Sequence, residues 1–531
     1  MEQEQTRASS RQHELPLEDR LSFLWLGVAF VILFFSNGLR IAPIAAWVGP
    51  LFLVRFLRTQ KAVRGLLIGY LTNAVLFFFQ WQSAFQDAGP MFTLYTAAFG
   101  LIVFLPYVAD RLLRPHVRGF AATLVLPAAW VVCEYALHLI LPLGTFFSMA
   151  YTQYVNLPLL QLMSVTGLWG VTFVVLWAAG VANYAWEGGF EVQRVGRGAA
   201  AYGLVVLLVL LGGGVRMAVS PPTADTVRVS VLTTDIDREV IPEWGEEQER
   251  RLVEGRLTDA DRQELGAVMA EINGDLMARS RVEAQAGSKI VVWTEYDAHV
   301  FKDEEDAFLD QVRALVREEQ IYMAIPLITL STDPALNPEP EKPVENKMVL
   351  VTPAGEIAYQ YTKANLLIGW EAEYAIRGPR KIQTVDTPYG RLAGVICLDM
   401  DYPDFMRQAG QQGVDIVLSG AIDGTQASRG NPMHSIMASY RAIESGMSMA
   451  RAGKYAQNLA VDYQGRTLAS SNYYTADGRT LVAHVPTKGT PTVYAHLGDF
   501  FPWLCILCLV GFVGCAIVGA FRSRPHAVIG S

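Results

Sequence analysis

Long apolar runs constrain this chain more than any other feature of its sequence. A bilayer's hydrocarbon core requires about 20 mostly apolar residues per helix. Seven stretches before residue 220 and one after residue 497 meet that requirement. The spans that we predict are 21–38, 41–57, 62–81, 91–109, 119–141, 159–186, 198–219 and 498–521.

The second run is the weakest of these spans. Arg40 and Pro43 open it and Pro50 interrupts it, so a re-entrant or tilted segment is the alternative there. The composition otherwise fits a membrane protein, since only 18% of the residues are charged, against about a quarter in soluble domains. The net charge of −8 and the scattered basic residues argue against a nucleic-acid partner.

Lys and Arg gather in alternate loops, which predicts how the chain is oriented. Positive side chains tend to stay in the cytoplasm during insertion. The loops 82–90 and 142–158 contain no Lys or Arg. The basic clusters are Arg7, Arg11 and Arg20; Arg55, Arg58, Lys61 and Arg64; Arg111, Arg114 and Arg118; and Arg194 and Arg197. We therefore expect a cytoplasmic N-terminus at 1–20, a membrane domain of about seven helices at 21–219, an extracytoplasmic domain at 220–497, a transmembrane helix at 498–521 and a cytoplasmic tail at 522–531.

From Thr226 onward, short β-branched runs alternate with charged helical stretches. Apolar strands of this kind are buried on both faces, so helices should cover them. The expected strands are 227–233, 289–295, 321–328, 347–352, 391–399 and 415–420, and the expected helices are 246–286 and 432–451. Turn signals at 353–355 and 462–465 predict paired strands, and the proline-rich segment 333–343 predicts a surface loop. The sequence therefore predicts a layered α/β domain.

Three polar residues stand at the ends of these strands or follow them. Glu295 ends one apolar strand, Lys363 follows an apparent hairpin, and Cys397 ends another strand and is the only cysteine between residues 220 and 497. Strand ends that open onto a crevice are a usual place for sites in α/β domains. A buried cysteine is, however, more often a small core residue than a nucleophile.

The segments WTE, YTKANL and GVICLDMDYP resemble, in order and spacing, the nitrilase superfamily. That superfamily carries a Glu-Lys-Cys triad on the strand ends of an α-β-β-α sandwich. The resemblance implies a polytopic α-helical membrane domain joined to a nitrilase-like sandwich, with Glu295, Lys363 and Cys397 as catalytic residues.

The chemistry of an acyl carrier explains these residue types. A thiolate on Cys397 would attack an ester or amide carbonyl, and Glu295 would take the thiol's proton and return it to the leaving group. The Lys363 ammonium and the Leu398 backbone N–H could stabilise the negative charge on the carbonyl oxygen. Lys363 should also lower the pKa of Cys397. No cofactor or metal enters this scheme.

Residues 130–173, with WVVCEY and GTFFSMAYTQYVNLPLLQLMSVTGLWGVTF, resemble the membrane region of bacterial apolipoprotein N-acyltransferases. The resemblance implies transfer of an acyl chain from a phospholipid, through a cysteine thioester, to the α-amino group of a diacylglyceryl-cysteine lipoprotein. It also implies a multi-pass protein of the bacterial inner membrane with a periplasmic catalytic domain. Glu371, eight positions after Lys363, matches a further glutamate of the family. A surface loop charge is its alternative reading.

Three segments depart from the family's pattern and mark a divergent member. The family usually has Pro-Phe-Gly-Glu where this chain has LIGWEAEY at 367–374, and Tyr-Glu where it has Leu398 and Asp399. Its Asn-Asp-Trp segment is replaced by GAIDGT at 420–425. The residues that match the family's helix are His434, Arg441 and Glu444. These loops help to set acceptor specificity, so another amine or alcohol acceptor stays open.

Several polar residues have structural as well as functional readings. Glu134 lies in an apolar span, where a carboxylate is costly and is usually functional or paired. His434 and Arg441 are more often structural than catalytic. Asp399 and Asp401 lack partners at metal-ligand spacing, so a metal is not expected.

The main functional alternative is a membrane-anchored nitrilase-type amidase in which water resolves the acyl-enzyme. Its triad would look the same, but a single anchor would suffice, whereas this chain has seven predicted spans before the domain. A non-enzymatic binding protein is disfavoured by the complete set of triad residue types.

Overall fold

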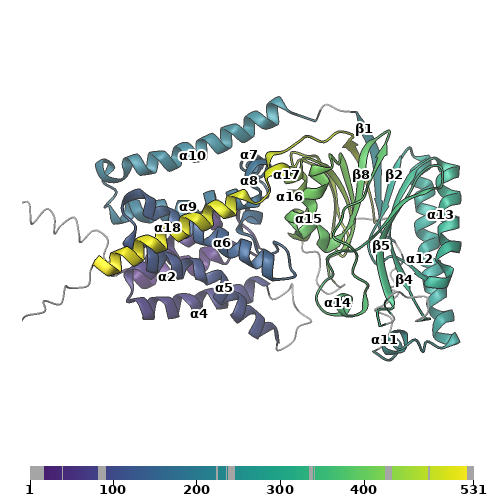
Figure 1. The fold of residues 1–531 in the computed structure, drawn as a ribbon, viewed down its shortest axis with the longest axis horizontal. Coiled ribbons are helices and arrows are strands. Elements are labelled where there is room, and N and C mark those ends of the chain that lie inside the picture. Colours follow the sequence, from purple (N-terminus) through teal and green to yellow (C-terminus); the bar gives the residue numbers. More distant parts are fainter. Residues whose placement is uncertain are drawn as a thin grey trace, which may run out of the picture. The chain divides into compact units, whose positions relative to one another are not determined.

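The computed structural model describes residues 17–522, apart from 39, 82–90, 223–224, 235, 237–245, 334–338, 340, 425–432 and 476–478. The chain divides into a helical unit and a sheet unit (Figure 1). The helical unit comprises Met1–Leu137, Phe147–Val215 and Asp499–Ser531, and the sheet unit comprises His138–Phe146 and Arg216–Gly498.

Six helical segments in the described part of the chain are long and apolar enough to cross a bilayer. They correspond to the helices α4 (Ala62–Trp81), α5 (Met91–Leu113), α6 (Val125–Ile140), α9 (Leu168–Glu187), α10 (Val192–Val219) and α18 (Phe500–Arg522). Two 3-10 turns, η3 (Arg114–His116) and η4 (Gly119–Leu124), connect α5 to α6. These six segments correspond to the third to eighth predicted spans.

The first two predicted spans form shorter helices. The helix α2 (Ser22–Leu33) has 12 residues and α3 (Pro43–Thr59) has 17, so both fall below the length of about 20 that a straight crossing requires. Gly38, with a φ of +75°, lies in the turn between them, and Pro43 begins α3. The expected helix over 21–38 is therefore too long at its C-terminal end.

The sixth predicted span, 159–186, is wrong as a continuous helix. Two short helices, α7 (Leu157–Leu160) and α8 (Met163–Thr166), precede α9. Gly167 separates α8 from α9 with a φ of +65°, which residues with a Cβ rarely adopt. Hydropathy carries no signal for such a break.

The sheet unit contains two sheets, each covered by helices on its outer face (Figure 1). The first has the order β13-β1-β2-β4-β5-β6, and β3 also pairs with β4. Its strands are β1 (Thr226–Leu232), β2 (Ile290–Trp293), β3 (Ala298–Phe301), β4 (Tyr322–Leu330), β5 (Val344–Val351), β6 (Ile357–Thr362) and β13 (Thr480–Pro486).

The second sheet has the order β12-β11-β10-β9-β8-β7. Its strands are β7 (Thr384–Thr387), β8 (Gly390–Ile396), β9 (Ile416–Ile422), β10 (Ser448–Lys454), β11 (Gln457–Val461) and β12 (Thr467–Asn472). The helices of the unit are α11 (Glu246–Val253), α12 (Asp259–Gln285), α13 (Glu305–Glu319), α14 (Trp370–Tyr374), α15 (Pro403–Gln411), α16 (Met433–Ser445) and α17 (Val493–Leu497).

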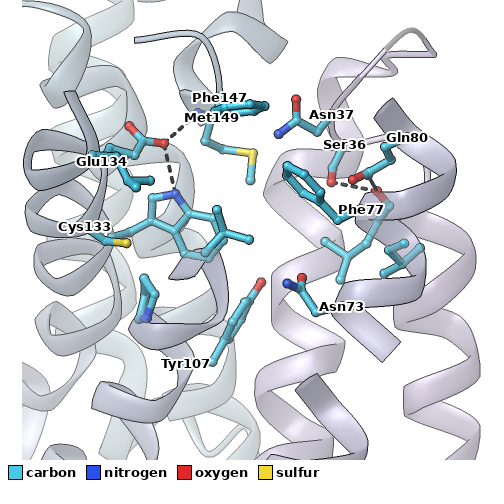
Figure 2. Close-up of a pocket in the computed structure, with 16 residues that line it drawn as sticks. Ser36, Asn37, Asn73, Phe77, Gln80, Tyr107, Cys133, Glu134, Phe147 and Met149 are labelled. Carbon is cyan, nitrogen blue, oxygen red and sulfur yellow. Dashed lines mark hydrogen bonds between the residues drawn. The ribbon is translucent and has the colours of Figure 1, made fainter. Parts of the chain in front are cut away.

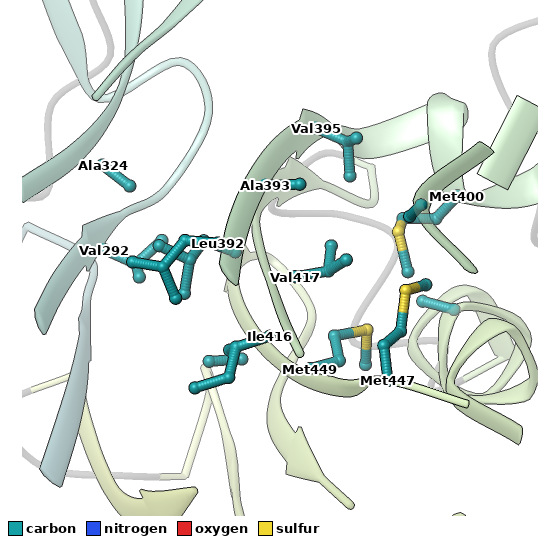
Figure 3. Close-up of a cluster of buried hydrophobic side chains, with 14 of the residues drawn as sticks. Val292, Ala324, Leu392, Ala393, Val395, Met400, Ile416, Val417, Met447 and Met449 are labelled. Atoms are coloured by element: carbon teal, nitrogen blue, oxygen red, sulfur yellow. The ribbon is translucent and has the colours of Figure 1, made fainter. Parts of the chain in front are cut away.

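Alternation along the strands builds the layers. Side chains of successive strand residues point to opposite faces. In β2, Val292 joins Leu392 of β8 in the core between the two sheets (Figure 3), whereas Trp293 packs in the core that includes α12 and α13. Both faces are thus apolar, which explains the unbroken hydrophobic runs. The expected α-β-β-α sandwich is confirmed.

The predicted turns are confirmed, since β5 pairs with β6 and β11 with β12, both antiparallel.

The predicted helix over 432–451 is wrong at its C-terminal end. The helix α16 stops at Ser445, Gly446 has a φ of +71°, and β10 begins at Ser448. A Cβ on Gly446 would lie 1.8 Å from the Thr490 carbonyl oxygen. Most of the proline-rich loop at 333–343 lies outside the described residues.

Candidate active site

Cys397 lies directly after β8, at the first position of the 3-10 turn η8 (Cys397–Asp401). Its φ is +47°, in the left-handed region that costs a residue with a Cβ about 1–2 kcal/mol. Backbone strain of this kind is concentrated at functional sites. The Sγ donates a hydrogen bond of 3.6 Å to the Ile422 carbonyl oxygen at the end of β9. The turn η8 also contains Leu398, which is buried.

Glu295 follows β2 and is fully buried. Its Oε2 accepts the backbone N–H of Ile422 at 3.2 Å, and its Oε1 accepts hydrogen bonds from Asn346 Nδ2 at 2.7 Å and Lys363 Nζ at 2.9 Å. The Ile422 carbonyl in turn accepts the hydrogen bond of the Cys397 thiol. The backbone of Ile422 therefore connects the Glu295 carboxylate with Cys397 through two hydrogen bonds.

Glu371 completes this arrangement from α14. Lys363 Nζ donates to both of its oxygens at 2.8 Å, and Asn346 Nδ2 donates to Oε1 at 2.9 Å. The backbone N–H of Leu367 donates to Oε2 at 2.8 Å. Glu371 is only 6% exposed, which rules out the reading as a surface charge. We call Glu295, Asn346, Lys363 and Glu371 the lysine cluster.

The lysine cluster sets the resting protonation states. Burial lowers the pKa of Lys363, but Glu295 and Glu371 outweigh it and raise that pKa well above its usual value. Burial and the Glu295 charge raise the pKa of Cys397 well above its usual value, although Lys363 lowers it. Lys363 therefore lowers the pKa of Cys397 as expected, but burial and the Glu295 charge outweigh it. The resting residue is therefore a thiol.

The sequence analysis did not predict Asn346 as a site residue, although the register of the predicted hairpin indicates it. Its carbonyl accepts the Lys363 N–H at 2.9 Å, directly across the β5–β6 hairpin. Counting outward from the turn at Ala354 and Gly355 pairs Asn346 with Lys363, so the predicted hairpin already places an amide beside the lysine.

Asp399 holds η8 in place. Its Oδ2 accepts hydrogen bonds from the Tyr361 hydroxyl at 2.8 Å and the Ile396 N–H at 3.1 Å, and its Oδ1 accepts two from Asn365 at 3.0 and 2.9 Å. Burial raises the pKa of Asp399 to about 6, against the opposing charge of Lys363. The carboxylate thus ties the turn that carries Cys397 to the segment after Lys363.

A second charged cluster lies near Cys397. His434, on α16, contacts Asp423 Oδ1 with Nδ1 at 2.6 Å and Asp401 Oδ2 with Nε2 at 2.9 Å. Arg451, on β10, donates to the same Asp423 Oδ1 at 2.5 Å. We call Asp401, Asp423, His434 and Arg451 the histidine cluster. On the same helix, Arg441 Nε lies 3.1 Å from Glu444 Oε2, which fits the structural reading of Arg441.

The histidine cluster reaches the thiol. One ligand atom each of Cys397, Asp423 and His434 lies within 4.8 Å of the other two. Burial lowers the pKa of His434, but Asp401 and Asp423 raise it to about 10, so the ring is an imidazolium at neutral pH. Only a neutral imidazole binds a metal ion. With His434 charged and Cys397 a thiol, Asp423 is the only anionic group of the three.

Glu134 belongs to the helical unit and has neutral partners. Its carboxylate accepts hydrogen bonds from Trp130 Nε1 at 3.0 Å, Met149 N at 2.7 Å, Ser148 Oγ at 2.9 Å and Thr172 Oγ1 at 3.0 Å. Figure 2 shows it beside a cavity of about 40 Å³. Four donors satisfy this carboxylate, which favours the structural reading.

Comparisons with known proteins cover both units. The family model "Carbon-nitrogen hydrolase" matches residues 279–497, and "Apolipoprotein N-acyltransferase N-terminal domain" matches residues 22–181. The apolipoprotein N-acyltransferase of Geobacter metallireducens is 23% identical over 454 residues, which cover 81% of this chain and 79% of that protein. The protein of the same name from Nostoc sp. is 24% identical over 408 residues, 72% of each chain.

Among solved structures, an amidase from Nesterenkonia sp. matches with 18% identity and a TM-score of 0.37, over 50% of this chain and 92% of that one. Two family models in this order, and relatives matched across most of their length, agree with the segments that carry the resemblance in the sequence. The chain is a divergent member of the apolipoprotein N-acyltransferase family, within the nitrilase superfamily.

Proposed function

We propose that this protein N-acylates lipoproteins. It transfers an acyl chain from a phospholipid to the α-amino group of the N-terminal diacylglyceryl-cysteine, through a thioester on Cys397. The connection of Glu295 to Cys397 through the Ile422 backbone, beside the buried Lys363 ammonium, supports this most directly. The relatives named apolipoprotein N-acyltransferase support the same reaction class.

In the first half-reaction, Glu295 takes the proton from the Cys397 Sγ and the thiolate attacks the ester carbonyl of the phospholipid. The positive charge of Lys363 and the Leu398 N–H stabilise the oxyanion. The new C–S bond forms, the C–O bond breaks, and Glu295 returns the proton to the leaving glycerol oxygen. The products are a lysophospholipid and an acyl-enzyme.

In the second half-reaction, the acceptor's amine attacks the thioester carbonyl. The C–N bond forms, the C–S bond breaks, and a proton passes by way of Glu295 to the leaving thiolate. Glu295 is suited to both half-reactions, because it ends each of them as the carboxylate with which it began.

The membrane context favours a lipid donor. The described part of the chain contains six membrane-length helical segments. The loop after Lys363 exposes Leu367 by 52% and Ile368 by 58%, which gives an acyl chain apolar side chains to contact. The distribution of Lys and Arg along the sequence supports an extracytoplasmic, periplasmic catalytic domain in the inner membrane.

Intact-protein mass spectrometry tests this function. The full-length enzyme is incubated with phospholipid alone and compared with Cys397→Ala. We expect a mass gain of one acyl chain that requires Cys397 and disappears when a diacylglyceryl-cysteine peptide with a free amine is added. No gain with any phospholipid, together with hydrolysis of simple amides, would instead establish the membrane-anchored amidase.

A further inference from the structure

One buried carboxylate oxygen beside the nucleophile is unused. The Asp423 side chain is 2% exposed. Its Oδ1 forms hydrogen bonds with both His434 and Arg451, whereas Oδ2 has no hydrogen-bond partner among the described residues. A buried oxygen of this kind loses its hydration and gains nothing in return, so leaving it unpaired costs about 1–3 kcal/mol or more when it is charged.

The oxygen is charged. Burial raises the pKa of Asp423, but Arg451 and His434 outweigh it and hold that pKa below its usual value. One carboxylate oxygen of Asp423 lies within 4.8 Å of the Cys397 Sγ and of a ring nitrogen of His434. The ionised side chain of Asp423 is therefore a fixed acceptor near the reacting sulfur.

Asp423 does not assist the first half-reaction. Its charge raises the pKa of Cys397 and so opposes formation of the thiolate, and Arg451 offsets that effect only in part. A carboxylate that hinders the loading step and leaves one oxygen free is better explained by the second step, in which a cationic amine must approach the same atom.

We propose that Asp423 Oδ2 binds the ammonium group of the acceptor and sets it against the thioester carbonyl. This inference rests on the proposed N-acylation and names the acceptor subsite within it. His434 and Arg451 are positioning residues, since both contact Oδ1 and leave Oδ2 without a hydrogen-bond partner among the described residues. The segment GAIDGT, which departs from the family's pattern, carries this residue.

Atoms and charge are conserved in this step for an acceptor R–NH3⁺ and an acyl group R′C(O). One ammonium proton leaves to solvent, and the amine nitrogen then forms the C–N bond as the C–S bond breaks. A second proton passes through Glu295 to the sulfur. The sum is R–NH3⁺ + R′C(O)–S–Cys397 → R′C(O)–NH–R + HS–Cys397 + H⁺, with Asp423 ionised throughout.

Substitution of Asp423 by Asn tests the subsite in the full-length enzyme. The acyl-enzyme is formed with phospholipid, and its loss on addition of a diacylglyceryl-cysteine peptide is timed by intact mass. We expect the rate of resolution, divided by the rate of loading, to fall at least about tenfold, because a charged hydrogen bond is lost. The control is Asp386→Asn, which removes an exposed carboxylate paired with Arg391, and its ratio should not change.

Binding to the full-length Cys397→Ala enzyme gives a second test, whose first comparison does not use the Asn variant. The free-amine peptide should bind at least about tenfold more tightly than the same peptide with an acetylated amine. The added change Asp423→Asn should remove that preference. Equal binding of the two peptides to Cys397→Ala, or a preference that survives Asp423→Asn, would overturn the inference.

The two proposals fail in different ways. A wild-type enzyme that gains no acyl group from phospholipid would refute the proposed function. A wild-type enzyme that loads and transfers normally, with an unchanged ratio in Asp423→Asn, would refute only the acceptor subsite.

Discussion

The lysine cluster and the histidine cluster both surround Cys397 with buried charges, but they differ in completeness. In the lysine cluster, all four oxygens of Glu295 and Glu371 accept hydrogen bonds. In the histidine cluster, Asp423 Oδ2 accepts none from the described residues. Carboxylates whose oxygens are all paired are held in one geometry, whereas an unpaired carboxylate oxygen has capacity for a ligand.

The lysine cluster and the histidine cluster also differ in net charge. The lysine cluster has two carboxylates against one ammonium, and the surplus negative charge suits a base that must take a proton from a thiol. The histidine cluster pairs two carboxylates with an imidazolium and a guanidinium, so its net charge is near zero. The histidine cluster therefore has no unbalanced charge when the cationic acceptor is absent.

Glu295→Gln should give the largest effect, because it removes the base and keeps the shape of the side chain. We expect acyl loading to slow by about a hundredfold to ten-thousandfold, the usual contribution of a positioned base. Intact mass measured against time gives the rate. The control Glu318→Gln, an exposed residue paired with Arg281 on the outer helices, should load normally. An equal loss in both variants would remove Glu295 from its role.

Lys363→Met should be the most destabilising change, since it leaves two carboxylates buried without their cation. The expected loss is about 3–5 kcal/mol of unfolding free energy, measured as a shift of the thermal midpoint in detergent. Lys302→Met, at a half-buried lysine that contacts Glu305 and Glu345, should cost about 1 kcal/mol. Similar shifts would mean that the lysine cluster is no more than an ordinary ion-pair network.

Asn346→Ala removes one donor from each glutamate of the lysine cluster. We expect a loss of about 1–3 kcal/mol in stability, together with slower loading. The matched control is Asn458→Ala, because Asn458 is also buried and accepts a backbone hydrogen bond from Gly453 in the second sheet. The control should lose stability but load at the normal rate. Normal loading by Asn346→Ala would show that the amide serves only folding.

His434→Gln should have the smallest effect, and one that depends on pH. Asp401 and Asp423 raise the pKa of His434 from 6.5 to about 10 despite its burial. A raised pKa adds stability that is fully present below pH 6.5 and is lost as the pH rises toward about 10. The difference in thermal midpoint between wild type and variant should shrink over that range. The groups that face His434 are Asp401, Asp423, Arg451 and Cys397, and a constant difference would show that they do not hold an imidazolium.

The sequence indicated Glu295 and Lys363 of the lysine cluster and the neighbouring Cys397 more clearly than the histidine cluster, and the reason is local. Glu295, Lys363 and Cys397 interrupt or follow apolar strands, so their positions stand out along the chain. The members of the histidine cluster come from η8, the end of β9, α16 and β10. Their meeting depends on the parallel pairing of β9 with β10 and on the packing of α16, which no short spacing encodes.

The helical unit shows the same limit. Apolar composition located the long helices, because burial in lipid requires an unbroken run of about 20 residues. It could not locate the break at Gly167, which depends on a backbone conformation rather than on hydropathy. It also could not predict that neutral donors would surround Glu134, because three of them, Met149, Ser148 and Thr172, lie at least 14 residues from it along the chain.

Peptide mapping tests the central claim, a thioester on Cys397, most directly. After incubation with phospholipid, trypsin should release the peptide 392–407, which begins after Arg391, ends at Arg407 and contains Cys397. We expect an acyl mass on this peptide that neutral hydroxylamine removes and that an added diacylglyceryl-cysteine peptide takes up. An unmodified peptide 392–407, in an enzyme that still acylates the lipopeptide, would contradict the account.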